Sequence, residues 1–138
     1  MSKKIVFTEK APKPVGPYSQ AVISGDFIFV SGQIPIDPKT SKVIEVGIEA
    51  QTVQVLENIK NILEGINLTL NDVVKTSVFL SSFSDFQSFN QVYSKYFEKN
   101  PPARTTVQAC LMAGVLLEID AIAKKPRNKQ REGKKGVI

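Results

Sequence analysis

Two apolar-rich runs near the C-terminal end of the chain, residues 103–109 and 115–123, most restrict what it can fold into. Their composition predicts two strands, and a Pro-Pro pair just before them ends whatever element precedes. Each predicted strand carries charge, Arg104 in the first and Glu118 with Asp120 in the second. Charged groups are costly to desolvate inside a sheet. Two explanations are open: a cross-strand ion pair with no further role, or a site that holds an anionic ligand and moves a proton.

Side chains alternate between the two faces of a strand, so each run can be divided by parity. In the second run, one face is wholly apolar: Val115, Leu117, Ile119, Ala121 and Ala123. The other face mixes charged and apolar residues: Leu116, Glu118, Asp120 and Ile122. In the first run, Arg104 falls on a mixed face with Thr106, and we expect the helices to pack on the opposite face, made of Thr105, Val107 and Ala109. The sequence leaves open whether Arg104 and Glu118 share one patch.

The rest of the chain predicts strands and helices that precede these closing strands. Apolar residues recur every three or four positions over residues 47–64 and again over 86–97, which is typical of amphipathic helices. The remaining predicted strands are residues 5–7, 21–24, 27–33 and 73–80, and residues 34–46 read as a loop with room for a small hairpin. The order β-β-β-α-β-α-β-β predicts one α+β domain over residues 1–124.

Two helices can cover only one face of such a sheet. The other face is not polar, because Phe27 and Phe29 alternate with Ile28 and Val30 and the closing strands are mixed. A semi-apolar sheet face that the chain itself does not cover is typical of a subunit interface. We therefore expect a homo-oligomer, with Arg104 near a subunit boundary together with Glu118.

Histidine is absent and cysteine occurs once, at position 110. These counts exclude catalytic triads that use histidine, His-ligated metals and Cys-rich zinc sites. No glycine-rich phosphate-binding pattern occurs either. Carboxylates, Lys, Tyr, Ser/Thr, Arg, backbone groups and water remain for catalysis. Cys110 itself is expected to be a small buried residue and not a nucleophile.

The net charge of +5 comes from the end of the chain, where Lys and Arg far outnumber acidic residues. We expect residues 125–138 to form a basic, flexible tail. Nucleic-acid binding by this tail is a weaker alternative, because aromatic residues do not interleave with the basic ones. No apolar run is long enough to span a membrane, and residues 1–12 lack the apolar core of a secretory signal. A cytoplasmic location is therefore expected, and a lone cysteine agrees with it.

Six short motifs occur in order along residues 5–124: GPYSQA at 16–21, SGQIP at 31–35, DVVKT at 72–76, Asn90 in the second helix, PART at 102–105 and EIDAIA at 118–123. Together they resemble the RidA/YjgF/YER057c/UK114 family. The resemblance implies a chorismate-mutase-like α+β fold, with two helices on one face of a six-stranded mixed sheet. It also implies a homotrimer in which the sheets face inward and the clefts between subunits hold the sites.

The resemblance implies a chemistry as well. Well-known members hydrolyse 2-aminoacrylate-type enamines and 2-imino acids, such as 2-iminobutanoate and 2-iminopropanoate, to 2-oxo acids and ammonium, without a metal or an organic cofactor. By this resemblance Arg104 would bind the substrate carboxylate through two N–H donors. Glu118 would orient or deprotonate a water molecule and return a proton to the leaving nitrogen. In a partly apolar cleft its pKa is expected to be raised.

The other residues carried by the resemblance would complete the site. Tyr18 would close it with its ring and hydroxyl, and Ser31 with the Gly32 backbone would line its floor. Asn90 would contact the site or cap local backbone groups, and the carbonyl of Thr106 would orient the water. Simpler roles stay open for two of them: Tyr18 as a half-buried core residue, and Glu118 as an ion-pair partner of Arg104 or a lysine.

The segment 110–114 departs from the family pattern, because it lacks a proline and brings the arginine and the glutamate one residue closer in sequence. A one-residue change reverses the facing of a strand unless a bulge or the turn absorbs it. Two other functions also stay open: RNA binding or endoribonuclease activity, and a non-catalytic trimer that binds carboxylates.

Overall fold

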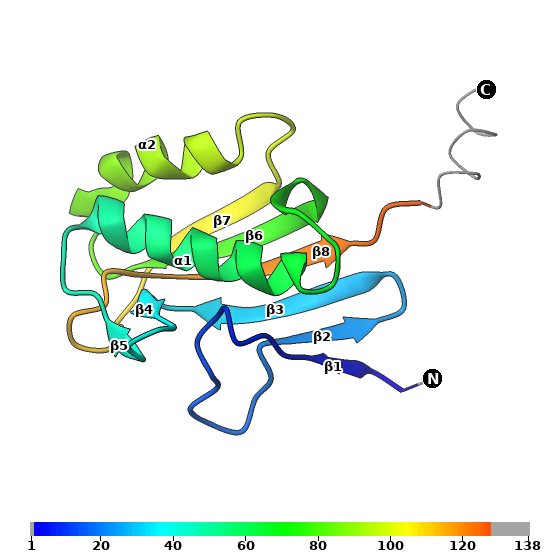
Figure 1. Cartoon of the computed structure of the whole chain (residues 1–138). Helices are drawn as coiled ribbons and strands as arrows, with labels where there is room; N and C mark the ends of the chain where they lie inside the picture. Colours follow the sequence, from blue (N-terminus) through cyan, green and yellow to red (C-terminus); the bar gives the residue numbers. More distant parts are fainter. Residues whose placement is uncertain (1, 128–138) are drawn as a thin grey trace.

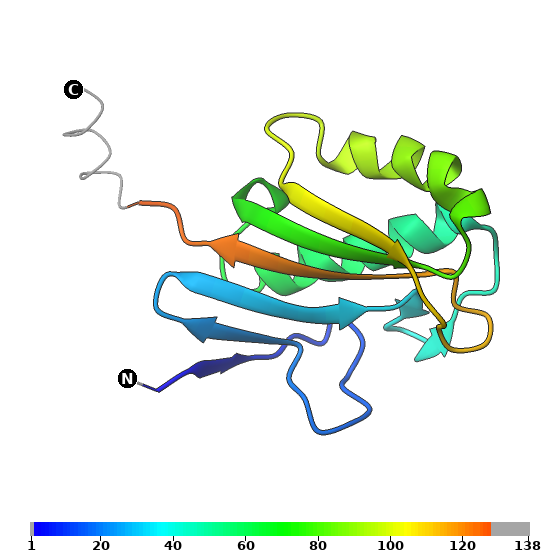
Figure 2. The same cartoon turned by 180° about the vertical axis from the view of Figure 1, so that it is seen from behind.

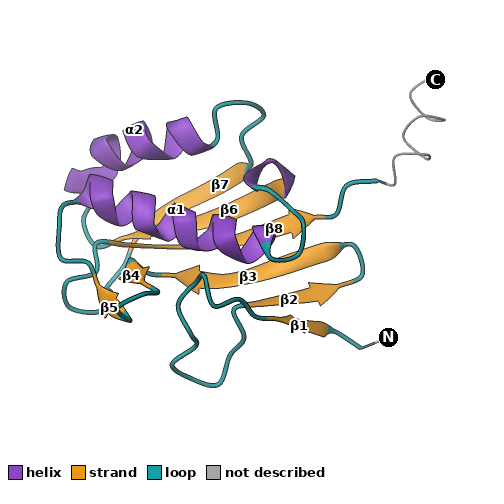
Figure 3. Ribbon diagram, viewed as in Figure 1, coloured by secondary structure: helices purple, strands orange, loops and turns teal. Residues whose placement is uncertain are grey.

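Six strands form one mixed sheet, and both helices pack across the same face of it (Figure 1). The computed structural model describes residues 2–127. Colouring by secondary structure separates the helical layer from the sheet (Figure 3). The elements are β1 (Lys4–Val6), β2 (Ala21–Ser24), β3 (Phe27–Gln33), β4 (Ile36–Asp37), β5 (Lys42–Val43), α1 (Ile48–Glu64), β6 (Val73–Leu80), α2 (Phe86–Tyr96), β7 (Ala103–Gln108) and β8 (Leu117–Lys124), with 3-10 turns at Leu70–Asp72 and Phe83–Asp85.

The strand order across the sheet is β1-β2-β3-β8-β6-β7. All neighbours are antiparallel except β6 and β7, which run parallel because α2 carries the chain back between them. The small hairpin β4–β5 stands apart from the main sheet. The α+β fold with two helices on one face of a six-stranded mixed sheet is confirmed, and so is the predicted element order.

The core lies between the helices and the sheet. Most of both predicted helical stripes is buried there, including Leu56 and Ile59 of α1 and Phe89 of α2, whereas Val53, which was also expected in the first stripe, is 40% exposed. The parity predicted for the last strand is also confirmed, since the side chains of β8 that face the helices are at most 2% exposed: Leu117, Ile119, Ala121 and Ala123. Burial of this apolar layer is the main source of stability in such a fold.

In the described part of the chain, residues 2–127, no helix lies across the opposite face of the sheet (Figure 2). In β3, Ile28 and Val30 are buried under the helices, whereas Phe27 and Phe29 on the other face are 40% and 46% exposed. Ile5 and Val107 add to this exposed apolar surface. An apolar sheet face of this kind fits the expected subunit interface, and the oligomeric state itself stays a prediction.

The facing expected for β7 is wrong. Arg104 pairs with Thr76 of β6, and Glu118 pairs with Phe79 of the same strand. Paired residues share a face, and two residues three apart on a strand point to opposite faces. Arg104 therefore lies on the helix-covered face and Glu118 on the uncovered face. The expectation failed because β7 is an edge strand, so that neither of its faces is fully covered and its apolar pattern is weak.

The closing strands β7 and β8 are not neighbours, because β6 lies between them. The connection between them is held by Gln51, a buried residue of α1. Its side-chain nitrogen donates to the carbonyl of Gly114 at 2.8 Å, and its oxygen accepts from the N–H of Leu116 at 2.8 Å. Cys110 in this connection is exposed, contrary to the expectation that it is buried.

Among residues 2–127, no helix is long and apolar enough to cross a bilayer. Of the predicted tail, residues 125–138, all but the first three positions lie outside the described residues. Within those three, the N–H of Lys125 donates to the carbonyl of Asp26 at 2.8 Å. The boundary between domain and tail stays a prediction.

Candidate active site

Most residues singled out in the sequence lie in two separate hollows, and Thr106 lines neither of them. The first, here called the Glu118 hollow, has a volume of about 370 Å³ and is lined by Val15, Tyr18, Ser31, Gly32, Ile34, Met112 and Glu118. The second, the Arg104 hollow, has a volume of about 390 Å³ and is lined by Asn90, Tyr93, Ser94, Phe97, Pro101, Pro102 and Arg104. One chain thus brings together Tyr18, Ser31, Gly32 and Glu118, and separately Asn90 and Arg104, but does not join the two groups.

In the Glu118 hollow, the glutamate side chain lies directly against the backbone of Gly32. A Cβ placed on Gly32 would come within 2.9 Å of the Cδ of Glu118 and closer still to its Oε2. No other amino acid fits here without displacing the carboxylate. The local geometry follows from an irregularity in the pairing of β3 with β8 between Val30 and Gln33, which re-aims this part of the strand. The sequence signal was the glycine in the SGQIP motif.

The pKa of the Glu118 carboxyl is raised above its ordinary value, first because burial disfavours the charged form and second because Asp120 lies nearby with the same charge. This agrees with the expectation for a carboxyl in a partly apolar cleft. Asp120 is itself held by the N–H of Ser77, which donates to its Oδ1 at 3.1 Å. A carboxyl with a raised pKa can both accept and return a proton near neutral pH.

Tyr18 and Ser31 line the same hollow but make different contacts. The ring of Tyr18 is half exposed, and its hydroxyl accepts a hydrogen bond from the N–H of Val15 at 3.3 Å. The hydroxyl of Ser31 donates to the carbonyl of Ser19 at 2.5 Å. Tyr18 therefore presents its ring to the hollow, whereas the Ser31 hydroxyl is engaged in holding the chain next to Tyr18.

In the Arg104 hollow, the guanidinium lies among three aromatic rings of α2. Its Cζ is 4.8 Å from the ring centroid of Tyr93, 5.5 Å from that of Phe89 and 5.8 Å from that of Phe86. Such contacts attract a cation to the ring faces. Nη1 donates to Oδ1 of Asn90 at 2.9 Å. Among residues 2–127 Arg104 has no carboxylate partner, so that the ion-pair explanation is not supported within one chain.

The aromatic surroundings of Arg104 were missed in the sequence. Tyr93 was assigned only to the apolar stripe of the second helix. In the structure it also lies beside the guanidinium and shares a 2.7 Å hydrogen bond with the hydroxyl of Thr76, and burial raises its pKa. A signal was present, because Phe86, Asn90 and Tyr93 recur at helical spacing and so share one face of α2.

Thr106 lies on the same face of β7 as Arg104, since it pairs with the buried Val78. Its hydroxyl oxygen is buried and has no hydrogen-bond partner among residues 2–127. Buried polar atoms are normally paired. The predicted role of Thr106, through its backbone carbonyl, does not depend on this side chain.

Together the two hollows offer complementary chemistry. One holds a cation suited to a carboxylate, and the other holds a carboxyl suited to proton transfer. Among residues 2–127, no group of three or more His, Cys, Asp or Glu residues lies close enough to hold a metal ion.

Comparison with known proteins decides the family. A family model described as Endoribonuclease L-PSP matches residues 8–125. The chain belongs to this family. It is the RidA/YjgF family that the motifs resemble, so the resemblance is confirmed. A RutC family protein of Saccharolobus solfataricus is 57% identical over 124 residues, covering 89% of this chain and 98% of that protein.

Two further members of the family bear on function. Reactive Intermediate Deaminase A of Arabidopsis thaliana, a chloroplastic protein, is 41% identical over 89% of this chain and 66% of its own length. The solved structure of Escherichia coli TdcF with bound serine is 38% identical, with a TM-score of 0.85 over 89% of this chain and 99% of that one. The family thus includes a named deaminase and a protein that binds a small amino carboxylate.

Proposed function

We propose that this chain is a hydrolytic deaminase of 2-aminoacrylate-type enamines and 2-imino acids, which releases 2-oxo acids and ammonium. The observation that carries the proposal is the pair of hollows: one holds a guanidinium that has no carboxylate partner within residues 2–127, and the other holds a carboxyl of raised pKa. The substrate class offers a carboxylate to the first and a C=N carbon to the second. The family's named deaminase and the serine bound to TdcF support the same choice.

In the proposed reaction, Arg104 holds the substrate carboxylate while Asn90 and the aromatic rings keep the guanidinium in place. Water adds to the C2 carbon of the imine, and Glu118 accepts one proton from that water. Glu118 then returns the proton to the nitrogen of the tetrahedral intermediate. The C2–N bond breaks as the new hydroxyl passes its proton through Glu118 to the departing nitrogen, which gives the 2-oxo acid and ammonia, and ammonia takes up a proton from solvent to become ammonium. Enamines enter the same route after protonation at C3.

We further propose that the site forms between subunits of a homotrimer whose uncovered sheet faces point inward. Arg104, Asn90 and Thr106 of one subunit would then meet Tyr18, Ser31, Gly32 and Glu118 of the next. Two observations support this. Each hollow holds only part of the predicted site, and the uncovered face carries half-exposed apolar residues such as Phe29. No cofactor is required in this scheme.

The direct test couples the protein to a threonine or serine dehydratase in a buffer that slows spontaneous imine hydrolysis. We expect faster release of the 2-oxo acid in the presence of the protein, and loss of this effect in Arg104→Ala and Glu118→Ala. No acceleration by a correctly assembled wild type would exclude the proposed function. It would leave a carboxylate-binding trimer as the explanation of the two hollows, which calorimetry with 2-oxobutanoate would detect.

A second candidate is RNA binding or endoribonuclease activity, which the description of the family model favours. Such binding is expected to weaken steeply as salt is raised. Truncation after Lys125 tests whether the basic tail is responsible. We propose a cytoplasmic location on the basis of the single cysteine, with fractionation as its test.

A further inference from the structure

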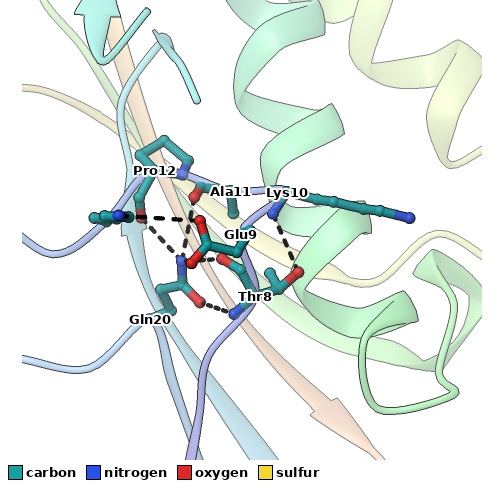
Figure 4. Close-up of polar contacts among 7 residues, drawn as sticks. Thr8, Glu9, Lys10, Ala11, Pro12 and Gln20 are labelled. Carbon is teal, nitrogen blue, oxygen red and sulfur yellow. Dashed lines mark hydrogen bonds and ion pairs between the residues drawn. The ribbon is translucent and has the colours of Figure 1, made fainter. Parts of the chain in front are cut away.

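Gln20 lies two residues after Tyr18 and is only 2% exposed. Its side-chain amide makes four hydrogen bonds to the backbone of the segment 8–12 (Figure 4). The N–H of Thr8 donates to its Oε1 at 2.7 Å, and its Nε2 donates to the carbonyls of Thr8 at 3.0 Å, Ala11 at 3.3 Å and Pro12 at 3.0 Å. One side chain thus binds a segment that belongs to neither a helix nor a strand.

These bonds fix the chain on the N-terminal side of the turn 15–18. On the C-terminal side, the backbone of Gln20 accepts a hydrogen bond from the N–H of Ser31 at 2.9 Å, and the Ser31 hydroxyl donates to Ser19. Both flanks of the turn are therefore tied to the body of the protein through Gln20 and Ser31.

The turn between these anchors holds Tyr18 mainly through its own internal contacts. The N–H of Tyr18 donates to the carbonyl of Gly16 at 2.8 Å, and a Cβ at Gly16 would lie 3.3 Å from the Tyr18 ring. Val15 is 86% exposed. Tyr18, Pro12 and Gly32 also line a second, narrow space of about 40 Å³. Because packing does not fix the turn, its place at the rim of the Glu118 hollow depends on the two anchors.

We propose that Gln20 is a positioning residue, which holds the ring of Tyr18 at the rim of the hollow that contains Glu118. The inference deepens the proposed function, and its effect on turnover rests on that function. Gln20 does not line the Glu118 hollow itself, and all four hydrogen bonds of its side chain go to the segment that precedes the turn, so we expect its effect on catalysis to pass through the turn. Misplacing a substrate-closing group by about 1 Å can lower kcat/KM by about 100-fold.

The test is a double-mutant cycle between Gln20 and Tyr18. Gln20→Met removes all four bonds at similar volume, and Tyr18→Ala removes the ring. We expect Gln20→Met to lower kcat/KM by about 10- to 100-fold in the wild type, but by less than about threefold in the Tyr18→Ala background. Equal losses in both backgrounds would overturn the inference, because they would mean that Gln20 acts without Tyr18.

Ile59→Ala is the matched control for stability. Ile59 is buried in α1 and lines neither the Glu118 hollow nor the Arg104 hollow, and its truncation to Ala is expected to lower the unfolding midpoint while every predicted site residue is kept. We expect this variant to retain the wild-type kcat/KM at temperatures below the midpoint of its thermal unfolding. If Gln20→Met fails to fold, Gln20→Glu replaces it, since its carboxylate still accepts from Thr8 but cannot donate to the three carbonyls.

A second measurement does not depend on activity. In protein labelled with 3-fluorotyrosine, the signal of Tyr18 is assigned by its absence in Tyr18→Phe. We expect the ¹⁹F signal of Tyr18 to move or broaden in the Gln20 variant, and the Thr8 amide to lose its protection from hydrogen exchange. A wild type without deaminase activity would overturn the proposed function, but it would not overturn the inference that Gln20 positions the ring of Tyr18. An unchanged Tyr18 signal would overturn the inference whether or not the protein is a deaminase.

Discussion

If Arg104 and Glu118 of different subunits form one site, two inactive variants should restore activity to each other. The first variant, Arg104→Ala, keeps an intact Glu118 hollow. The second, Glu118→Ala, keeps an intact Arg104 hollow. Within one chain the two side chains lie on opposite faces of the sheet, so that neither variant alone can build a complete site in the proposed trimer.

The expected gain follows from the number of junctions in a closed ring. In a trimer that contains both kinds of chain, three junctions each pair the Arg104 hollow of one subunit with the Glu118 hollow of the next. Whether the composition is two to one or one to two, one junction pairs two intact hollows. We therefore expect about one third of wild-type activity in mixed trimers, and about one half if the ring were a dimer.

The assay uses two affinity tags, one on each variant, and purification on both tags in sequence after co-expression. Wild type carrying both tags and purified in the same way sets the full activity. The dehydratase-coupled release of 2-oxo acid is then compared per subunit. Activity of the mixed trimers no higher than that of either variant alone would refute a site shared between subunits, provided that the trimers are intact by sedimentation.

Three further predictions follow from the same structure. Glu118→Gln should lower kcat by about 100-fold. Because the pKa of Glu118 in the folded protein is raised above its ordinary 4.5, the free energy of unfolding of the wild type should decline as the pH rises from about 4.5 through that raised pKa. If the free energy of unfolding depends on pH equally in the variant and the wild type, this prediction is contradicted. Gly32→Ala should displace the Glu118 carboxylate and lower kcat/KM by at least about tenfold, with little change in far-ultraviolet circular dichroism. If this variant keeps the activity of the wild type, the position of the carboxylate does not matter for catalysis. Phe29→Glu should place a charge in the uncovered sheet face and shift the protein toward monomers in analytical ultracentrifugation, whereas an unchanged sedimentation coefficient would argue against assembly through this face.

Much of the fold followed from strong local signals. The helical stripes, the order of the elements and the parity of β8 are set by long runs that are buried on one side, where alternation is hard to mistake. The cluster of Tyr18, Ser31, Gly32 and Glu118 followed from motifs whose residues meet around one irregularity in β3.

The face of the sheet on which Arg104 lies could not be predicted from the sequence, for two physical reasons. Val107 of the edge strand β7 points to the uncovered face and remains 40% exposed, so that the apolar residue does not mark the core side. Arg104 packs toward the helices despite its charge, because the rings of α2 accept a guanidinium and Asn90 supplies a hydrogen-bond acceptor. An expectation that charged side chains point away from the helices does not anticipate these contacts with the guanidinium.

The shortened connection 110–114 has less influence on the register of the closing strands than its place between them in the sequence suggests. A one-residue change shifts register only between strands that pair with each other. β7 and β8 each pair with β6, so the register of each is set separately along that strand, and the connection has only to bridge them. Gln51 anchors it near its end, at Gly114 and Leu116.

The separation of Arg104 from Glu118 also has an electrostatic consequence. A guanidinium next to Glu118 in the same chain would lower the pKa of its carboxyl and remove its ability to return a proton near neutral pH. On opposite faces, Glu118 keeps a pKa that is raised by burial and by Asp120, and Arg104 keeps donors for a ligand. In the proposed assembly the two charges meet only across a substrate whose own carboxylate neutralises the guanidinium. The substrate thus completes the ion pair, and Glu118 remains available to transfer a proton.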